Sequence, residues 1–103
     1  MIDLTEKDRA EICRLANDIF APNTELWAYG SRVKGTNHDT SDLDLVINTP
    51  AEQPLDVEQL VAFKLALQQS NIPIMIQVLD WLRIPESFRQ NILTHYEVLL
   101  RVE

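Results

Sequence analysis

The chain has 103 residues, a size typical of one domain, and its hydrophobic fraction of 46% and charged fraction of 24% indicate a soluble globular protein. Its net charge of −7 excludes general nucleic-acid binding, which needs a basic face, and no apolar run reaches the ~20 residues that span a bilayer. The acidic residues 1–8 contain no signal-peptide core, and the single Cys13 cannot form an internal disulfide. We therefore expect a cytoplasmic protein without direct membrane or nucleic-acid contacts.

The first half of the chain predicts a helix followed by two strands. A helix over Thr5–Phe20 is indicated by an apolar stripe at intervals of three and four residues, formed by Ile12, Leu15, Ala16 and Ile19. Thr5 is a suitable capping residue for this helix. We then expect a short strand over Glu25–Tyr29, a turn at Gly30, one helical turn after Ser31, and a second strand over Asp42–Asn48.

The second half predicts two helices and one further strand. A helix over Asp56–Gln69 precedes a nearly continuous apolar strand over Ile74–Leu79, a pattern that indicates burial on both faces. A last helix is expected from Pro85 to about Glu97. The apolar run 96–102 either packs back on the core or forms a surface for a partner. These elements predict an α+β (α/β) fold, one small sheet with helices packed on it, as a single domain over residues 1–103.

Two aspartates on the second strand have the arrangement of a metal site. Side chains alternate across a strand, so Leu43, Leu45 and Ile47 form the core face, and Asp42 and Asp44 project together from the other face. Two carboxylates about 4 Å apart repel by ~4 kcal/mol at an effective dielectric constant of 20, and a bound cation removes that repulsion. Mg²⁺ is held in many proteins by one or two carboxylates together with substrate phosphates. The alternative is a pair of solvated aspartates on an exposed sheet face.

The turn before these aspartates has the composition of a phosphate site. Gly30 can take a positive φ angle and turn the chain sharply at the strand end. Ser31 then offers a hydroxyl and a backbone amide, and Arg32 and Lys34 bring positive charge to the same loop. We therefore expect these four residues to bind the phosphates of a nucleotide. The alternative is an ordinary turn with solvated basic side chains.

The spacing of these two elements resembles the signature of a known superfamily. Gly30-Ser31, ten intervening residues and then Asp42-Leu43-Asp44 match the pattern of the DNA polymerase beta-like nucleotidyltransferases. The surrounding segments 26–35 and 41–47 resemble those of its minimal nucleotidyltransferases, as do the later segments 77–81 and 87–92. The likeness therefore covers nearly the whole chain. The spacing from Gly-Ser to Asp-x-Asp is the part most specific to this superfamily, and the C-terminal segments are less specific.

The resemblance implies a fold, an activity and a partner. The family has a mixed sheet flanked by helices and transfers a nucleoside monophosphate from an NTP, here expected to be ATP, to a hydroxyl with Mg²⁺ (or Mn²⁺). By resemblance, Gly30 and Ser31 hold the triphosphate, and Asp42 and Asp44 are the catalytic residues that bind the metal. Many minimal members act as the antitoxin of a small helical HEPN-type toxin, and some transfer AMP onto it.

The chain departs from the family at one position. Active members carry a third carboxylate on the next core strand, and alignment on Val78-Leu79-Asp80-Trp81 puts Gln77 there. Gln77 can offer a neutral oxygen ligand to the metal but no useful base, and loss of a general base typically costs 10²–10⁴-fold in rate. Asp80 is three residues away, so strand alternation points it to the opposite face, where we expect it to cap or pair locally. We expect Gln77 to open on the cleft of the aspartates; the alternative is an exposed sheet edge.

Two functions therefore stay open. The first is an enzyme that transfers AMP from ATP to a hydroxyl of a partner protein. The second is a catalytically impaired pseudo-nucleotidyltransferase that binds a nucleotide or a helical partner as an antitoxin module. Both require something outside this chain, or a homo-oligomer, because a domain that binds the acceptor is not evident within it. We lean toward the enzyme, although Gln77 counts against turnover.

Overall fold

The computed structural model describes residues 2–38, 41–50 and 55–103. Its elements in chain order are α1 (Glu6–Ile19), β1 (Glu25–Tyr29), α2 (Ser31–Lys34), β2 (Leu43–Asn48), α3 (Val57–Gln68), β3 (Ile76–Asp80), the 3₁₀ turn η1 (Trp81–Arg83), α4 (Glu86–Thr94) and β4 (Tyr96–Arg101). The strands form one sheet in the order β3-β2-β1-β4. β1 pairs antiparallel with β2 and β4, whereas β2 and β3 are parallel, so the expected small mixed sheet flanked by helices is confirmed.

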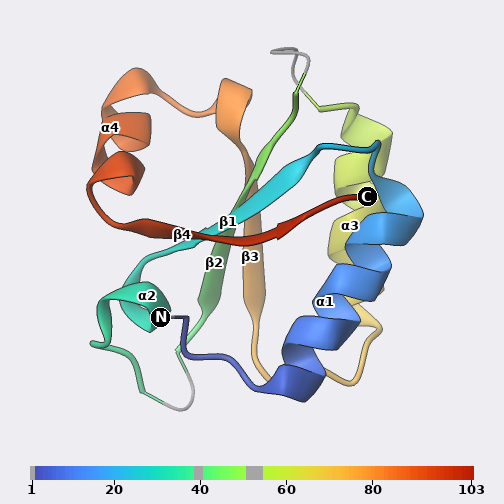
Figure 1. The fold of residues 1–103 in the computed structure, drawn as a ribbon, viewed down its shortest axis with the longest axis horizontal. Helices are drawn as coiled ribbons and strands as arrows, with labels where there is room; N and C mark the ends of the chain where they lie inside the picture. Colours follow the sequence, from blue (N-terminus) through green and yellow to red (C-terminus); the bar gives the residue numbers. More distant parts are fainter. Residues whose placement is uncertain (1, 39–40, 51–54) are drawn as a thin grey trace.

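Helices cover both faces of the sheet, but they do so unequally. Helices α1 and α3 lie side by side over one face, and α4 lies over part of the other (Figure 1). The main core fills the first interface and includes Ile12 and Ala16 of α1, Phe63 and Leu67 of α3, and Leu43, Leu45 and Ile47 of β2. A smaller cluster on the second face joins Trp27, Val46 and Ile92. The part of the second face that this cluster leaves uncovered is where the two aspartates lie.

Helix α1 begins as the sequence predicts. The hydroxyl Oγ1 of Thr5 accepts a hydrogen bond from the Asp8 amide at 3.1 Å, which satisfies one of the free donors of the first turn. Cys13 lies half-buried on this helix, and burial raises the pKa of its thiol, as expected for a packing residue. Within the three described ranges, no helix is both long and apolar enough to cross a membrane.

The prediction for the last helix is wrong at its C-terminal end. The helix stops at Thr94, His95 is extended, and Tyr96–Arg101 forms β4 against β1. A register shift opposite Leu26 and Trp27 interrupts the usual alternation, so that consecutive Leu99 and Leu100 are both buried. Because a bulge hides the two-residue period, this segment does not look like a strand in the sequence.

The strand predicted over Ile74–Leu79 is also partly wrong. It runs over Ile76–Asp80 and lies at one end of the sheet. Val78 is buried, but Gln77 is exposed and Met75 is 68% exposed. The expected burial on both faces therefore does not occur, because the small cluster on the second face packs against Leu79 and does not include Gln77.

Asp80 holds the end of β3 in place, as expected. Its side chain is buried and accepts hydrogen bonds from the amides of Leu55 at 2.8 Å and Leu82 at 3.2 Å. Arg83 forms an ion pair with it at 3.4 Å. These contacts face away from the aspartates of β2, so Asp80 has a structural role.

The substitution Asp80→Ala should lower the free energy of unfolding by about 2–3 kcal/mol, because it leaves buried amides without an acceptor. Urea denaturation measures this change. The matched control is Asp18→Ala, which removes a carboxylate that is 64% exposed and pairs with Arg14 on the surface, and it should cost less than about 0.5 kcal/mol. Equal losses for the two variants would contradict the role given to Asp80.

Candidate active site

Gly30 brings the end of β1 against Asp44. Its φ of 82° and ψ of −158° belong to a region that only glycine adopts without strain. A Cβ atom at this position would overlap the carboxylate oxygen Oδ2 of Asp44. The backbone conformation of the turn therefore requires glycine, and a side chain here would move the Asp44 carboxylate out of its present position.

The four-residue helix α2 follows directly from this turn. The amides of Val33 and Lys34 both donate to the Gly30 carbonyl, at 3.1 and 3.0 Å, and Gly35 closes the turn onto Ser31 at 2.9 Å. Ser31 is half-buried at the first position of α2, and Lys34 is exposed. The predicted helical turn after Ser31 is thus confirmed, with the serine next to the glycine that contacts Asp44.

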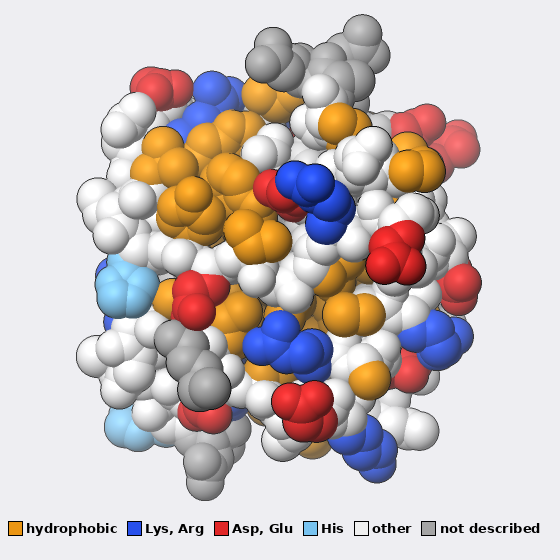
Figure 2. All heavy atoms as spheres, viewed as in Figure 1, with side chains coloured by type: hydrophobic (Ala, Val, Ile, Leu, Met, Phe, Trp, Pro, Cys, Tyr) orange, Lys and Arg blue, Asp and Glu red, His pale blue; other side chains and the backbone are white. Residues whose placement is uncertain are grey.

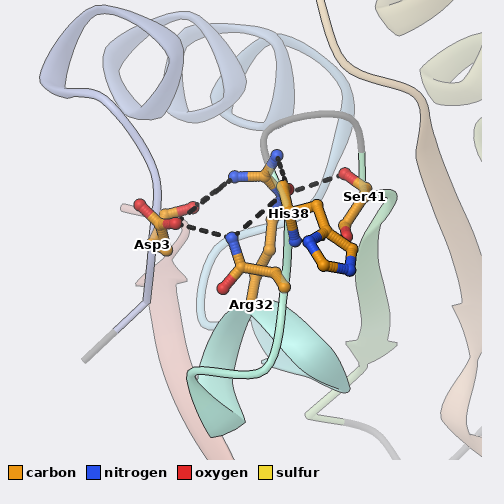
Figure 3. Close-up of polar contacts among 5 residues, drawn as sticks. Asp3, Arg32, His38 and Ser41 are labelled. Atoms are coloured by element: carbon orange, nitrogen blue, oxygen red, sulfur yellow. Dashed lines mark hydrogen bonds and ion pairs between the residues drawn. The ribbon is translucent and has the colours of Figure 1, made fainter.

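Arg32 points into the protein (Figure 3). It is 6% exposed, and its guanidinium donates to the carbonyls of Ser41 at 3.0 Å, Asp3 at 2.8 Å and His38 at 3.5 Å. The Asp3 carboxylate lies 3.9 Å away. Arg32 therefore fastens the loop that leads into Asp42, and in this arrangement it supports the site from behind. The His38 residue itself is exposed.

Asp42, Asp44 and Gln77 lie together on the second face of the sheet. Gln77 is the direct neighbour of Asp44 in the parallel register of β2 and β3. Its amide Nε2 donates to Asp42 Oδ2 at 3.0 Å. Partial burial raises the pKa of the Asp44 carboxyl, and the nearby charge of Asp42 raises it further. The sequence therefore identified three residues that the fold brings together, and both earlier readings of Gln77 hold, since it is at an exposed edge and beside the aspartates.

Tyr29 forms the other wall of the site. It is opposite Asp44 in the antiparallel register of β1 and β2, and its ring meets Phe88 of α4 edge-to-face at 6.0 Å. Burial, and then the Asp44 charge, raise the pKa of its phenol to about 12, so it is a neutral hydroxyl at physiological pH. The sequence suggested a place for Tyr29 at the edge of the cleft, but we did not count it among the site residues. The sequence feature that points to this place is its position directly before Gly30, two residues after Trp27 and therefore on the same face of β1.

The donor set suits a hard cation that a substrate completes. Among the described residues, no three His, Cys, Asp or Glu side chains gather in one place. Two carboxylates and one amide do, and Mg²⁺ commonly takes one or two carboxylates and finds its other ligands among phosphates and water. Asp42 and Asp44 could hold the ion, and Gln77 would join them once its amide rotates to present the oxygen.

Comparison with known proteins identifies the family. The model of the family described as "Polymerase beta, Nucleotidyltransferase" matches residues 15–102. The chain belongs to this nucleotidyltransferase family. It is 34% identical over 102 residues to the probable protein adenylyltransferase MntA of Haemophilus influenzae, covering 99% of this chain and 87% of that protein.

A solved structure, described as a toxin-antitoxin with AMP-PNP, has the same fold. It superposes with a TM-score of 0.73 over 90% of this chain and 73% of that one, at 20% identity. The family model and the 34% identical relative confirm the expected membership of the polymerase beta-like nucleotidyltransferases, and the solved structure confirms the fold.

The substitution Gly30→Ala should lower the free energy of unfolding by about 2 kcal/mol, because alanine is strained at this φ and ψ. It should also abolish the nucleotide binding that the sequence leads us to expect, because the new methyl group displaces the Asp44 carboxylate. Gly35→Ala is the control: its φ is 79°, but nothing lies within 4 Å of its Cβ position, so only about 1 kcal/mol of backbone strain applies. Thermal unfolding and nucleotide titration of both variants measure the difference. Unchanged binding in Gly30→Ala would contradict the close contact.

The raised pKa of Asp44 predicts that Asp44→Asn increases the free energy of unfolding by an amount that depends on pH. The folded protein binds this proton more readily than the unfolded chain, so the free energy of unfolding falls as pH rises from the ordinary value of 3.8 through the folded-state pKa. Without metal, Asp44→Asn should be more stable than the unsubstituted protein at pH 7, with the gap closing at pH 4. Mg²⁺ should raise the melting temperature of the unsubstituted protein more than that of Asp44→Asn. A gap that widens toward acid pH would contradict this sign.

Proposed function

We propose that this protein transfers AMP from ATP to a hydroxyl group of a partner protein, using Mg²⁺, for which Mn²⁺ can substitute. The partner we propose is the helical HEPN-type toxin of a toxin–antitoxin pair, in which this chain is the antitoxin. The observation that carries the proposal is the convergence of Asp42, Asp44 and Gln77 beside the turn at Gly30 and Ser31. The likeness to a probable protein adenylyltransferase, and to a toxin-antitoxin structure with AMP-PNP, supports the choice of nucleotide and partner.

Each residue has a proposed task. Gly30 leaves room for the triphosphate, Ser31 binds it through its hydroxyl and amide, and the exposed Lys34 adds charge to the loop. Arg32 takes part by holding that loop from inside. Asp42 and Asp44, with Gln77 as a neutral third ligand, hold the metal, which supplies charge neutralisation at the reacting phosphate.

The reaction balances as a single displacement. The acceptor oxygen forms a bond to the α-phosphorus, the bond from that phosphorus to the bridging oxygen of the β-phosphate breaks, and pyrophosphate leaves. The hydroxyl proton passes to solvent, because Gln77 cannot accept it. We therefore expect a slow transfer reaction, by the 10²–10⁴-fold that a missing general base typically costs.

One contact supports a second candidate function. The Gln77 amide occupies Asp42 Oδ2, an oxygen that a metal would need. In a pseudo-nucleotidyltransferase this bond would keep the two strands together, and the chain would act as an antitoxin by binding alone.

Incubation with Mg²⁺, labelled ATP and the product of the neighbouring gene, the proposed partner, separates the two candidates. Label should appear on the partner and disappear in Asp42→Ala and in Asp44→Ala, because each removes half of the charge that holds the metal. Gln77→Asp should raise the rate by about 10²-fold by restoring a base. Transfer is measured by gel autoradiography and partner binding by calorimetry.

Asp18→Ala is the matched control, since it removes one carboxylate far along the surface of α1 and should leave transfer unchanged. Absence of label from all proteins, with partner binding that survives Asp42→Ala, would favour the binding module. Absence of both label and binding would exclude both candidates.

A further inference from the structure

A groove of about 820 Å³ runs between α3 and β3. Its walls come from Val61, Lys64, Leu65, Leu67 and Gln68 on the helix and from the consecutive residues 72–79 on the turn and strand. Because neighbouring residues of β3 point to opposite faces, this continuous lining means that the groove follows the end of the sheet and wraps around it. It is a different place from the turn at Gly30, which lies at the end of β1 against Asp44 of β2.

Helix α3 is apolar on more sides than its core requires. Phe63 and Leu67 are buried against the sheet, whereas Val57, Val61 and Leu65 are 56%, 51% and 48% exposed. A helix that covers one core normally carries polar residues on its outer face. Val61 and Leu65 thus give the groove an apolar wall that the described chain does not cover.

The strand that forms the other wall lacks the usual protection of a sheet end. Residues 76–79 of β3 carry no charge and no proline, and they pair with β2 in an unbroken register. Within the described ranges no strand lies on their far side. The opposite end, β4, has a register shift and the charged Glu97 and Arg101, features that discourage strand addition. β3 is therefore the better template for an added strand.

A second apolar patch on the molecule differs from the groove, because none of its exposed residues described below contacts the aspartates or Gln77 through a hydrogen bond. Figure 2 shows hydrophobic side chains gathered over α4 and β4. Leu93, Tyr96 and Val98 are 42%, 37% and 49% exposed there. By contrast, the groove reaches the candidate site directly, because Gln77 lines it and also bonds to Asp42 at 3.0 Å.

We infer that the groove between α3 and β3 binds an extended segment of the acceptor protein, which adds to the end of the sheet at β3 and presents its hydroxyl side chain to Asp42 and Asp44. This inference rests on the proposed function. Alternate apolar side chains of the segment would pack on Val61 and Leu65, and main-chain hydrogen bonds along β3 would fix its direction. Among the described residues that line the groove, Lys64 alone is charged, so the groove itself favours an apolar stretch of the segment. The net charge of −7 of the whole chain disfavours a second copy of it and favours basic residues on either side of that stretch, outside the groove.

Fluorescence anisotropy with a labelled synthetic peptide, Lys-Val-Thr-Val-Tyr-Val-Lys, tests the groove without nucleotide. Val61→Lys and Leu65→Lys should each weaken peptide binding at least roughly tenfold, because they place a charge against apolar side chains and repel the basic ends. Val57→Lys is the matched control, since it puts the same charge on the same helix outside the groove lining. Val98→Lys controls for the second patch, and both controls should bind within twofold of the unsubstituted protein.

Hydrogen exchange gives an independent readout: the peptide should slow exchange of amides in β3 and not in β4. The inference is overturned if the unsubstituted protein does not bind the peptide, if all four variants bind it equally, or if the peptide protects β4 instead. The inference is also overturned if the chain forms a dimer that Leu65→Lys abolishes and does not bind the peptide. In that case the groove is a self-association surface. Peptide binding in the groove without any label transfer would contradict the proposed function and leave the groove as a binding site. Label transfer that is unchanged in Leu65→Lys would contradict the role of the groove and leave the proposed function intact.

Discussion

The packing of β2 against the main core decides where the whole site lies. Leu43, Leu45 and Ile47 are each 0% exposed, so the strand cannot slip by one residue without moving all three out of the main core to the opposite face. Loss of three such burials would cost several kcal/mol, at roughly 1.5–3 kcal/mol for each side chain. Asp44 is held on the opposite face as a consequence. Its neighbours are then set by register, with Tyr29 on one side and Gln77 on the other.

The second face of the sheet shows how a small protein leaves room for a site. Trp27 packs edge-to-face on Trp81 at 5.1 Å and stacks on Tyr96 at 4.6 Å, and this aromatic group, with Val46 and Ile92, supplies the apolar burial that α4 needs. Toward the C-terminal end of β1 this cluster gives way to Tyr29 and then to the aspartates. The Asp44 carboxyl is therefore only partly hydrated, which is the physical origin of its raised pKa and of its suitability for a cation.

The two halves of the proposed reaction are served by different ends of this arrangement. The turn at Gly30 and the loop held by Arg32 lie on the side of β2 that faces β1, where a triphosphate would approach. The groove lies on the side that faces β3, where an acceptor would approach. Gln77 stands between them, bonded to Asp42 and lining the groove. A carboxylate there would add charge to the proposed metal site, whereas the amide keeps a hydrogen bond to Asp42.

The sequence by itself determined the local parts of this protein. The alternation of β2, the cap at Thr5, the turn at Gly30 and the spacing from Gly30-Ser31 to the aspartates all follow from neighbours close in the chain, and the structure has each of them. Only the tertiary structure decided the rest. A bulge hid β4 from its sequence period, burial turned Arg32 into a support for the loop, and the end position of β3 left Gln77 exposed beside Asp42. These outcomes depend on which strand pairs with which, and that choice rests on contacts between residues far apart in the chain.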